Sequence, residues 1–235
     1  MRFPCWGGKR KGAGRKKVRP GAASHARREE LDARHPVHTT LSVPGDIDSL
    51  RQPDVAACIE DCLRAAERAR IAEDRPFRVV HYAIQRHHLH FIVEAGSKKA
   101  LSRGMQGLAI RLARGINRTL RRVGPVFADR YFERILRSPR QVSHCVRYVL
   151  NNERRHVLQR GQTCEAGWID PFSSGRYFDG WRGVKVKPPP EGEWPVAPAE
   201  TWLLAAGWRR HGLVPVDAIP GPQRRRRPQR PAGAR

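Results

Sequence analysis

Long apolar runs and paired cysteine motifs are both missing from this sequence of 235 residues. No apolar stretch reaches the ~20 residues that a membrane-spanning helix needs, and residues 1–6 contain no apolar core of a signal peptide. The five cysteines form no Cys-x-x-Cys pair and no regular disulfide framework. These absences argue against a membrane-bound or secreted protein, and we expect a soluble, reduced protein of the cytoplasm.

Acidic residues are absent from both ends of the chain. Residues 1–28 contain 10 Lys and Arg, residues 224–235 contain 6 Arg, and neither segment has an Asp or Glu. Residues 101–160 add 14 Arg against three acidic residues, and the whole chain has a formal net charge of +24 and a pI of about 11.3. Positive charge of this size, gathered in separate segments, indicates a polyanionic partner such as nucleic acid.

Composition divides the chain into four segments. Residues 1–33 are a Gly/Lys/Arg arm that cannot bury a core, and we expect it to be disordered until it meets nucleic acid. A solvated basic tail without a specific role explains this arm equally well. Residues 34–160 have the patterns of a folded domain. Residues 161–222 are a loop-rich extension with a short amphipathic helix at 201–211 that docks back on the domain, and residues 223–235 are an Arg-rich tail.

Periodicity predicts a mixed α+β domain. Alternating and β-branched residues predict strands, and apolar residues spaced three or four apart predict helices. Strands are expected at 36–43, 77–85, 88–94 and 126–136, and helices at 47–73, 101–123 and 140–158. This order is that of a ferredoxin-like split β-α-β sheet, with about four antiparallel strands and the helices on one face.

The run His88-Leu89-His90 opens the strand expected at 88–94. Because side chains alternate along a strand, His88 and His90 project from one face while Leu89 points to the other. Two neighbouring imidazoles are ready ligands for a divalent metal ion. Two half-buried histidines on an amphipathic strand would give the same pattern, so both interpretations stay open at this point.

The helix expected at 140–158 has an unusual polar face. Val142, Val146 and Val149 form its apolar stripe at 100° per residue. Tyr148 and Asn152, four residues apart, share a different side. A tyrosine turned away from the core is either a functional group or a surface ring lying over its neighbours.

The helix expected at 101–123 has one apolar and one basic side. The basic side carries Arg111, Arg114, Arg118, Arg121 and Arg122, and Arg130 follows in the next strand. Arginines contact phosphates and stack on unpaired bases, so we predict that these six residues bind DNA. A solvated cationic face is the alternative, and we expect no carboxylates to pair with these arginines.

Together these motifs resemble those of the HUH single-tyrosine transposases, particularly the REP-associated tyrosine transposases. The resemblance covers about residues 34–160 and is carried by His88-Leu-His90, Asn117-Arg118, Gly124-Pro-Val-Phe-Ala-Asp-Arg-Tyr-Phe132 and Arg147-Tyr-Val-Leu-Asn-Asn152. It implies a ferredoxin-like catalytic domain that cleaves single-stranded or hairpin DNA with a divalent metal ion, Mg²⁺ or Mn²⁺.

The resemblance also assigns roles by position. It implies that His88 and His90 are metal ligands and that Asn152 completes the metal site. Tyr148 matches the nucleophile, which forms a 5′-phosphotyrosine intermediate. Tyr131 is a rival nucleophile, but its counterpart in the family is structural.

Two positions depart from the family pattern. Glu153 follows the Asn where the REP-associated members usually have Pro, and Arg86-His87 precede the first metal histidine in place of a Pro-Asn-like pair. We therefore carry two functions forward: a strand transferase associated with the nucleoid, and a non-catalytic nucleic-acid-binding protein on the same scaffold. The sequence favours neither a monomer nor a homodimer.

Overall fold

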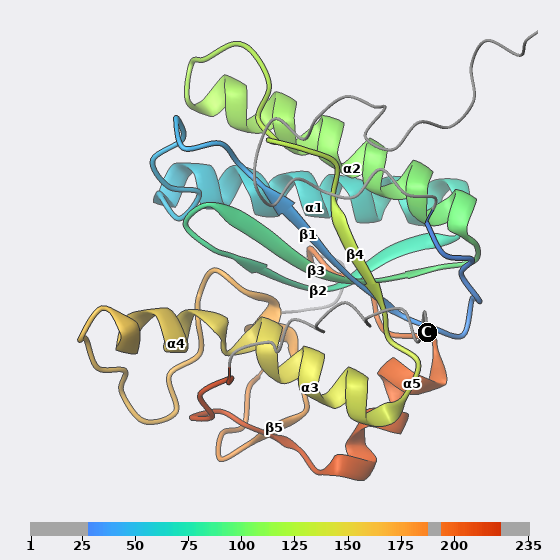
Figure 1. The fold of residues 1–235 in the computed structure, drawn as a ribbon, viewed down its shortest axis with the longest axis vertical. Helices are drawn as coiled ribbons and strands as arrows, with labels where there is room; N and C mark the ends of the chain where they lie inside the picture. The colour runs from blue at the N-terminus through green and yellow to red at the C-terminus, as the bar shows by residue number, and fades with distance from the viewer. Residues whose placement is uncertain (1–27, 188–193, 222–235) are drawn as a thin grey trace, which may run out of the picture.

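The computed structural model describes residues 28–187 and 194–221 (Figure 1). Most of the expected 1–33 arm and all of the 223–235 tail lie outside these residues. The first elements are β1 (Val37–Ser42), α1 (Pro53–Glu73), β2 (Phe77–Ile84), β3 (His88–Ala95), α2 (Lys98–Thr119), β4 (Phe132–Ile135), α3 (Pro139–Leu150) and α4 (Asn152–Gln159). They are followed by η1 (Ser174–Tyr177), β5 (Trp181–Arg182), α5 (Trp202–Ala205), η2 (Gly207–His211) and β6 (Val214–Pro215). No helix within the described ranges is long and apolar enough to cross a membrane.

The main sheet has four strands in the order β2-β3-β1-β4, and each pair of neighbours is antiparallel. Helices α1 and α2 are the two crossovers, linking β1 to β2 and β3 to β4. This strand order and chain order confirm the α+β class and the ferredoxin-like split β-α-β arrangement. The two central strands, β1 and β3, pair so that Thr40 lies opposite His90 and Ser42 opposite His88.

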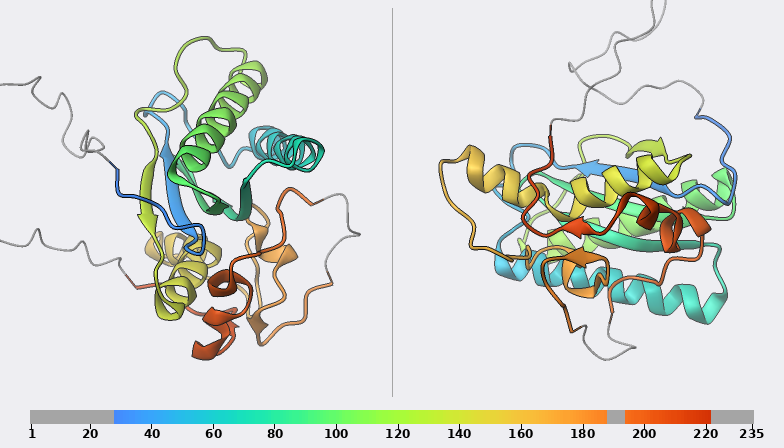
Figure 2. Two further views of the ribbon diagram at one scale, coloured as in Figure 1. Left: turned by 90° about the vertical axis from the view of Figure 1, so that its right-hand side faces the viewer. Right: turned by 90° about the horizontal axis from the view of Figure 1, so that it is seen from below.

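Helices cover both faces of this sheet, so the expectation that all of them share one face is wrong. The crossovers α1 and α2 lie on one face as expected, whereas α3, α4 and α5 lie on the other (Figures 1 and 2). The reason is visible in β3, where seven of the eight residues are buried. A strand buried on both sides needs a covering layer on both sides.

Each face of the sheet has its own apolar core. Leu89, Phe91 and Val93 pack against α1 and α2, whereas Ile92 packs on the opposite side with Val146 of α3. The C-terminal segment completes this second core with Phe178, Trp181, Leu203, Leu204, Trp208 and Val214. The helix expected at 201–211 is present as α5 and η2, and it docks on α3 as expected.

The helix expected at 140–158 is two helices, with a break at Asn151. This residue has φ −105° and ψ 10°, and its Nδ2 donates a hydrogen bond to the carbonyl oxygen of Pro215 at 3.1 Å. Tyr148 and Asn152 therefore lie on two different helices.

Other element ends also differ from expectation. Helix α1 begins at Pro53 rather than near Ile47, because Pro is favoured in the first helical turn, and Ile47 is buried in the preceding turn. Helix α2 begins earlier, at Lys98, because the Ser97 hydroxyl accepts a hydrogen bond from the Ala100 amide. Strand β4 is only four residues long.

The buried His81 of β2 predicts a loss of stability in mild acid. Burial lowers its pKa from 6.5 to about 4. Because the folded pKa lies below the unfolded one, protonation favours unfolding, and stability is lost as the pH falls from about 6.5 towards 4. This one group accounts for about 2 kcal/mol between pH 7.5 and pH 5.

Urea unfolding of the wild type and of His81→Leu at pH 7.5 and pH 5 measures this effect. The variant should lose about 2 kcal/mol less than the wild type over this interval. An equal loss in the two proteins would contradict the prediction.

Candidate active site

His88 and His90 project from the same face of β3, as predicted. Their ring centroids are 4.6 Å apart, and Leu89 packs into the core of the opposite face. His90 is buried, and His88 is half-buried. The face that carries both imidazoles is the one covered by α3, because Ile92, two residues further along, packs there.

A third histidine, His38 of β1, completes this cluster and was not predicted from the sequence. Its Nε2 lies 3.1 Å from Nδ1 of His90, and Oγ1 of Thr40 lies 3.1 Å from the same atom. The sequence pattern that could have indicated it is the two-residue spacing of His38 and Thr40 on a predicted strand. Without the register between β1 and β3, that spacing did not connect these residues with His90.

The contacts at Nδ1 leave the other ring nitrogen of His90 free. Nε2 of His90 is buried and has no hydrogen-bond partner among the described residues. A histidine held at one ring nitrogen by polar neighbours presents the other as a ligand in a fixed direction.

Burial keeps all three imidazoles neutral near pH 7. It lowers the pKa of His38 and of His88 to about 4, with smaller contributions from Arg134 and His156 respectively. Burial also holds the pKa of His90 well below 6.5, with His38 adding to the effect. A neutral imidazole is the form that binds metal ions.

Helix α3 brings Tyr148 to the histidines. Its apolar stripe, which includes Val142, Val146 and Val149, is buried against the sheet, so Tyr148 reaches the margin of that contact. The Tyr148 ring lies edge-on to both histidines, at 5.3 Å from His90 and 6.0 Å from His38 between centroids. Burial raises the pKa of Tyr148 above 10, so its phenol is protonated at neutral pH.

Tyr131, the rival nucleophile, lies elsewhere. Its ring packs against the core on the α1/α2 side of the sheet, and the guanidinium of Arg28 lies 3.6 Å above it. Burial raises the pKa of Tyr131 to about 12. Tyr131 therefore contacts a different part of the molecule from the histidine cluster.

Asn152 is the first residue of α4, whereas Tyr148 lies in α3. It is buried, and its Nδ2 has no partner among the described residues. The next residue, Glu153, is also buried, and its carboxylate pairs with Arg160 at 2.7 Å. His156, one turn further on, lowers the pKa of both His88 and His90, which places α4 beside the histidine cluster.

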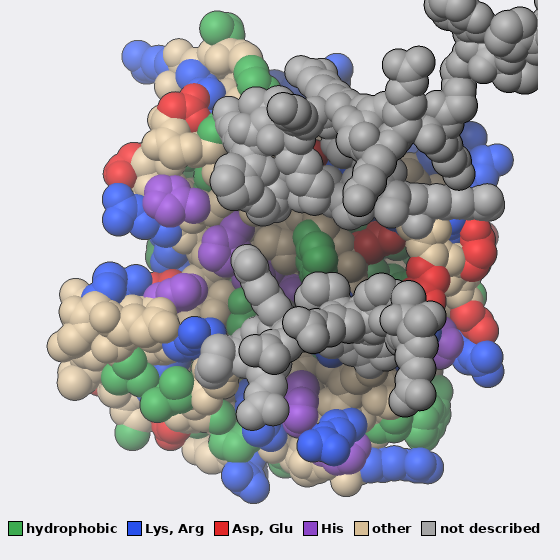
Figure 3. Space-filling view, in the orientation of Figure 1, with side chains coloured by type: hydrophobic (Ala, Val, Ile, Leu, Met, Phe, Trp, Pro, Cys, Tyr) green, Lys and Arg blue, Asp and Glu red, His purple; other side chains and the backbone are tan. Residues whose placement is uncertain are grey.

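A groove of about 680 Å³ opens beside Tyr148 between β4, α3 and the C-terminal segment. It is lined by Arg134, Ser138, Arg140, Gln141, His144, Cys145, Arg147, Tyr148 and residues 219–221. Its three arginines were not predicted from the sequence, although Arg140 and Arg147, seven residues apart, share one side of α3. Histidine and Lys/Arg side chains gather on this face of the molecule in Figure 3.

The six arginines predicted to bind DNA are not part of this groove. Arg111, Arg114 and Arg118 are on α2, which covers the opposite face of the sheet. Arg122 pairs with Asp46 at 2.8 Å, so the expectation that no carboxylate meets this set is wrong for that residue. Arg121 and Arg130 lie in the segment between α2 and β4.

No known family model matches this chain, and no curated protein matches it. One similar solved structure is described as a REP-associated tyrosine transposase bound to a REP hairpin. It is 18% identical, the alignment covers 66% of this chain and 84% of that chain, and the TM-score is 0.48. Identity this low does not establish a shared function, so the function of this chain has to be inferred from the residues of its own site.

The contacts of His90 predict its protonation. We expect a single neutral tautomer with the proton on Nδ1, because Thr40 and His38 offer acceptors there and Nε2 has none. Long-range ¹H–¹⁵N NMR of the ¹⁵N-labelled protein at pH 7 distinguishes the two ring nitrogens. His38→Phe with Thr40→Val should mix the tautomers, and a wild-type proton on Nε2 would refute the assignment.

Proposed function

We propose that this protein is a metal-dependent strand transferase for single-stranded, hairpin-bearing DNA, with Tyr148 as its nucleophile. The observation that carries the proposal is the placement of Tyr148 against His90 and His38, from an element more than fifty residues away in the chain. A half-buried phenol beside neutral imidazoles, at the margin of an arginine-lined groove, suits attack on a phosphodiester.

The bonds that form and break in the chemical step belong to the substrate and Tyr148. Oη of Tyr148 attacks a backbone phosphorus and forms an O–P bond with it, while the P–O3′ bond breaks. The phosphate stays on the 5′ oxygen of the downstream strand, which is thereby attached to the tyrosine. The phenol proton leaves, and the departing 3′ oxygen gains a proton to become a free hydroxyl. Because the phosphotyrosine conserves the bond, a second 3′-hydroxyl can reverse the step and join a new partner.

The residues around the cluster suit a divalent cation, Mg²⁺ or Mn²⁺, in part. His88 and His90 would hold it, since both are neutral and Nε2 of His90 has no other partner. A cation bound there would polarise the scissile phosphate and neutralise its developing charge. Within the described residues no three His, Cys, Asp or Glu are grouped to hold a metal. The resemblance to the HUH transposases assigns the third ligand to the amide oxygen of Asn152.

The groove arginines supply the binding energy for the strand. Arg134, Arg140 and Arg147 line it next to Tyr148, and none of the three has a carboxylate partner among the described residues. Unpaired guanidiniums attract phosphates, and this attraction weakens steeply with salt.

A second function, nucleic-acid binding without cleavage, uses the same groove. It is favoured because, within the described ranges, neither His38 with His88 and His90 nor any other three His, Cys, Asp or Glu form a group that could hold a metal ion. The two functions predict the same salt-sensitive binding and differ only in the covalent product.

Covalent trapping separates the two functions. A hairpin oligonucleotide labelled at its 3′ end is incubated with the protein and Mn²⁺, and we expect a labelled adduct that survives denaturation. The same oligonucleotide labelled at its 5′ end should give a shorter free strand and no adduct, because the tyrosine retains the 5′-phosphate side.

Tyr148→Phe should abolish the adduct, and the matched variant Tyr131→Phe should retain it, since Tyr131 packs on the other face of the sheet. No adduct from the wild type with any hairpin substrate would favour the binding protein. An adduct that persists in Tyr148→Phe would assign the nucleophile elsewhere.

Metal binding is tested by thermal unfolding with and without Mn²⁺. A cation that binds only the folded state raises its stability, by about 2.7 kcal/mol at 100 times the Kd. His88→Ala should lose this increase while salt-sensitive DNA binding remains. His87→Ala is the matched control because this adjacent imidazole is exposed, and an equal increase in all three proteins would count against the site.

A further inference from the structure

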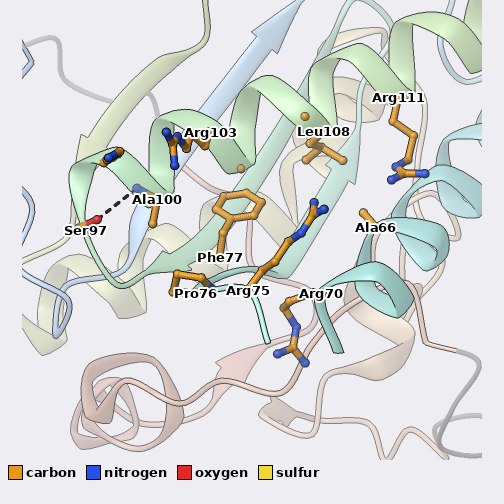
Figure 4. A pocket seen from close by; sticks show the side chains of 13 residues that line it. Ala66, Arg70, Arg75, Pro76, Phe77, Ser97, Ala100, Arg103, Leu108 and Arg111 are labelled. Carbon is orange, nitrogen blue, oxygen red and sulfur yellow. Dashed lines mark hydrogen bonds between the residues drawn. The ribbon is translucent and has the colours of Figure 1, made fainter. Parts of the chain in front are cut away.

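A second groove lies on the opposite face of the sheet, between the C-terminal part of α1 and the N-terminal half of α2 (Figure 4). Its volume is about 510 Å³. It is lined by Ala66, Arg70, Arg75, Pro76, Phe77, Ser97, Lys99, Ala100, Arg103, Gly104, Gly107, Leu108 and Arg111. The mechanism proposed for Tyr148 uses none of these residues.

The floor of this groove is apolar. Phe77, Leu108, Ala66, Ala100 and Pro76 supply it. The half-buried ring of Phe77 reaches the floor because α2 has a glycine opposite it. A Cβ atom on Gly104 would lie 2.1 Å from Cγ of Phe77, so any other residue would displace the ring.

The rim of the groove along α2 is basic and regularly spaced. Lys99, Arg103, Gly107 and Arg111 are four residues apart and therefore form one stripe, with about 6 Å between turns. Gly107 leaves the middle of the stripe open, since a Cβ atom there would meet nothing within 4 Å.

The cations on the α2 stripe are unpaired. Arg70 and Arg75, on the α1 side, are held by Glu67 and Glu73. Lys99, Arg103 and Arg111 have no carboxylate partner among the residues that the structure describes, and α2 itself contains no acidic residue.

We propose that this groove is a second nucleic-acid site, which binds a single-stranded segment without sequence preference. Bases stack over Phe77, and phosphates lie along Lys99, Arg103 and Arg111. An apolar, aromatic floor beside a row of unpaired cations is the combination that single-stranded nucleic acid requires. Because the groove and Tyr148 lie on opposite faces of the sheet, the segment held here is not the segment that Tyr148 contacts.

Binding is measured with a fluorescent oligothymidylate in a Tyr148→Phe background, so the result does not depend on cleavage. The test variant is Lys99→Gln/Arg103→Gln/Arg111→Gln. The matched control, Arg182→Gln/Lys185→Gln/Lys187→Gln, removes three exposed cations elsewhere. We expect the test variant to weaken binding about tenfold and to lower the salt slope by about 2, since each phosphate contact contributes about 0.7. Equal losses in the two variants would overturn the proposal.

Photocrosslinking locates the bound strand. An oligonucleotide containing 5-iodouracil should crosslink to a peptide that includes Phe77, and Phe77→Leu should remove that product. Gly107→Leu should reduce the same crosslink several-fold by filling the groove with all charges intact. Gln106→Leu, at the exposed neighbouring position, should leave it unchanged.

Crosslinks confined to peptides of the Tyr148 groove would overturn the proposal. The proposal would also be overturned if an oligoglutamate bound more tightly than the oligothymidylate and lost its affinity in the Lys99/Arg103/Arg111 variant. The groove would then be a site for an acidic protein segment. Failure of Tyr148 to form an adduct affects neither measurement.

Discussion

Strand β3 is buried on both faces, and the rest of the structure depends on that constraint. Its odd-numbered residues, from Leu89 to Val93, are apolar and are covered by the two crossover helices. Its even-numbered residues include His88 and His90, which lie on the other face. Their burial requires a second layer of structure, which a sheet with helices on one face only does not have. Helix α3 and the C-terminal segment provide this layer, and α3 brings Tyr148, Arg140 and Arg147 with it.

A site residue was predictable from the sequence where local geometry sets its position, and not where contacts between distant segments set it. The pairing of His88 with His90 follows from alternation within one strand, which is local. His38 is adjacent to His90 only because β1 and β3 pair in a particular register, and a single sequence does not specify that register. The strand order was predictable because the two crossover helices limit the ways in which the four strands can be ordered in the sheet.

The helix that carries Tyr148 shows the same division. Its apolar stripe was clear in the sequence, but the stripe alone does not determine which face of the sheet the helix covers. The break at Asn151 was also hidden, since it depends on a hydrogen bond to Pro215, sixty-four residues away. Positive charge was apparent from composition, yet its separation onto two faces of one sheet required the fold.

The three residues 219–221 line the same groove as Tyr148 and Arg147. Ile219 is 60% exposed there, so its contact with the groove contributes little apolar burial. Any strand that enters the groove must share it with this segment or displace it. Docking of the segment and affinity for the strand are then thermodynamically linked, and each changes the other by the same factor. A strand bound in this groove would therefore compete with residues 219–221 for the same space.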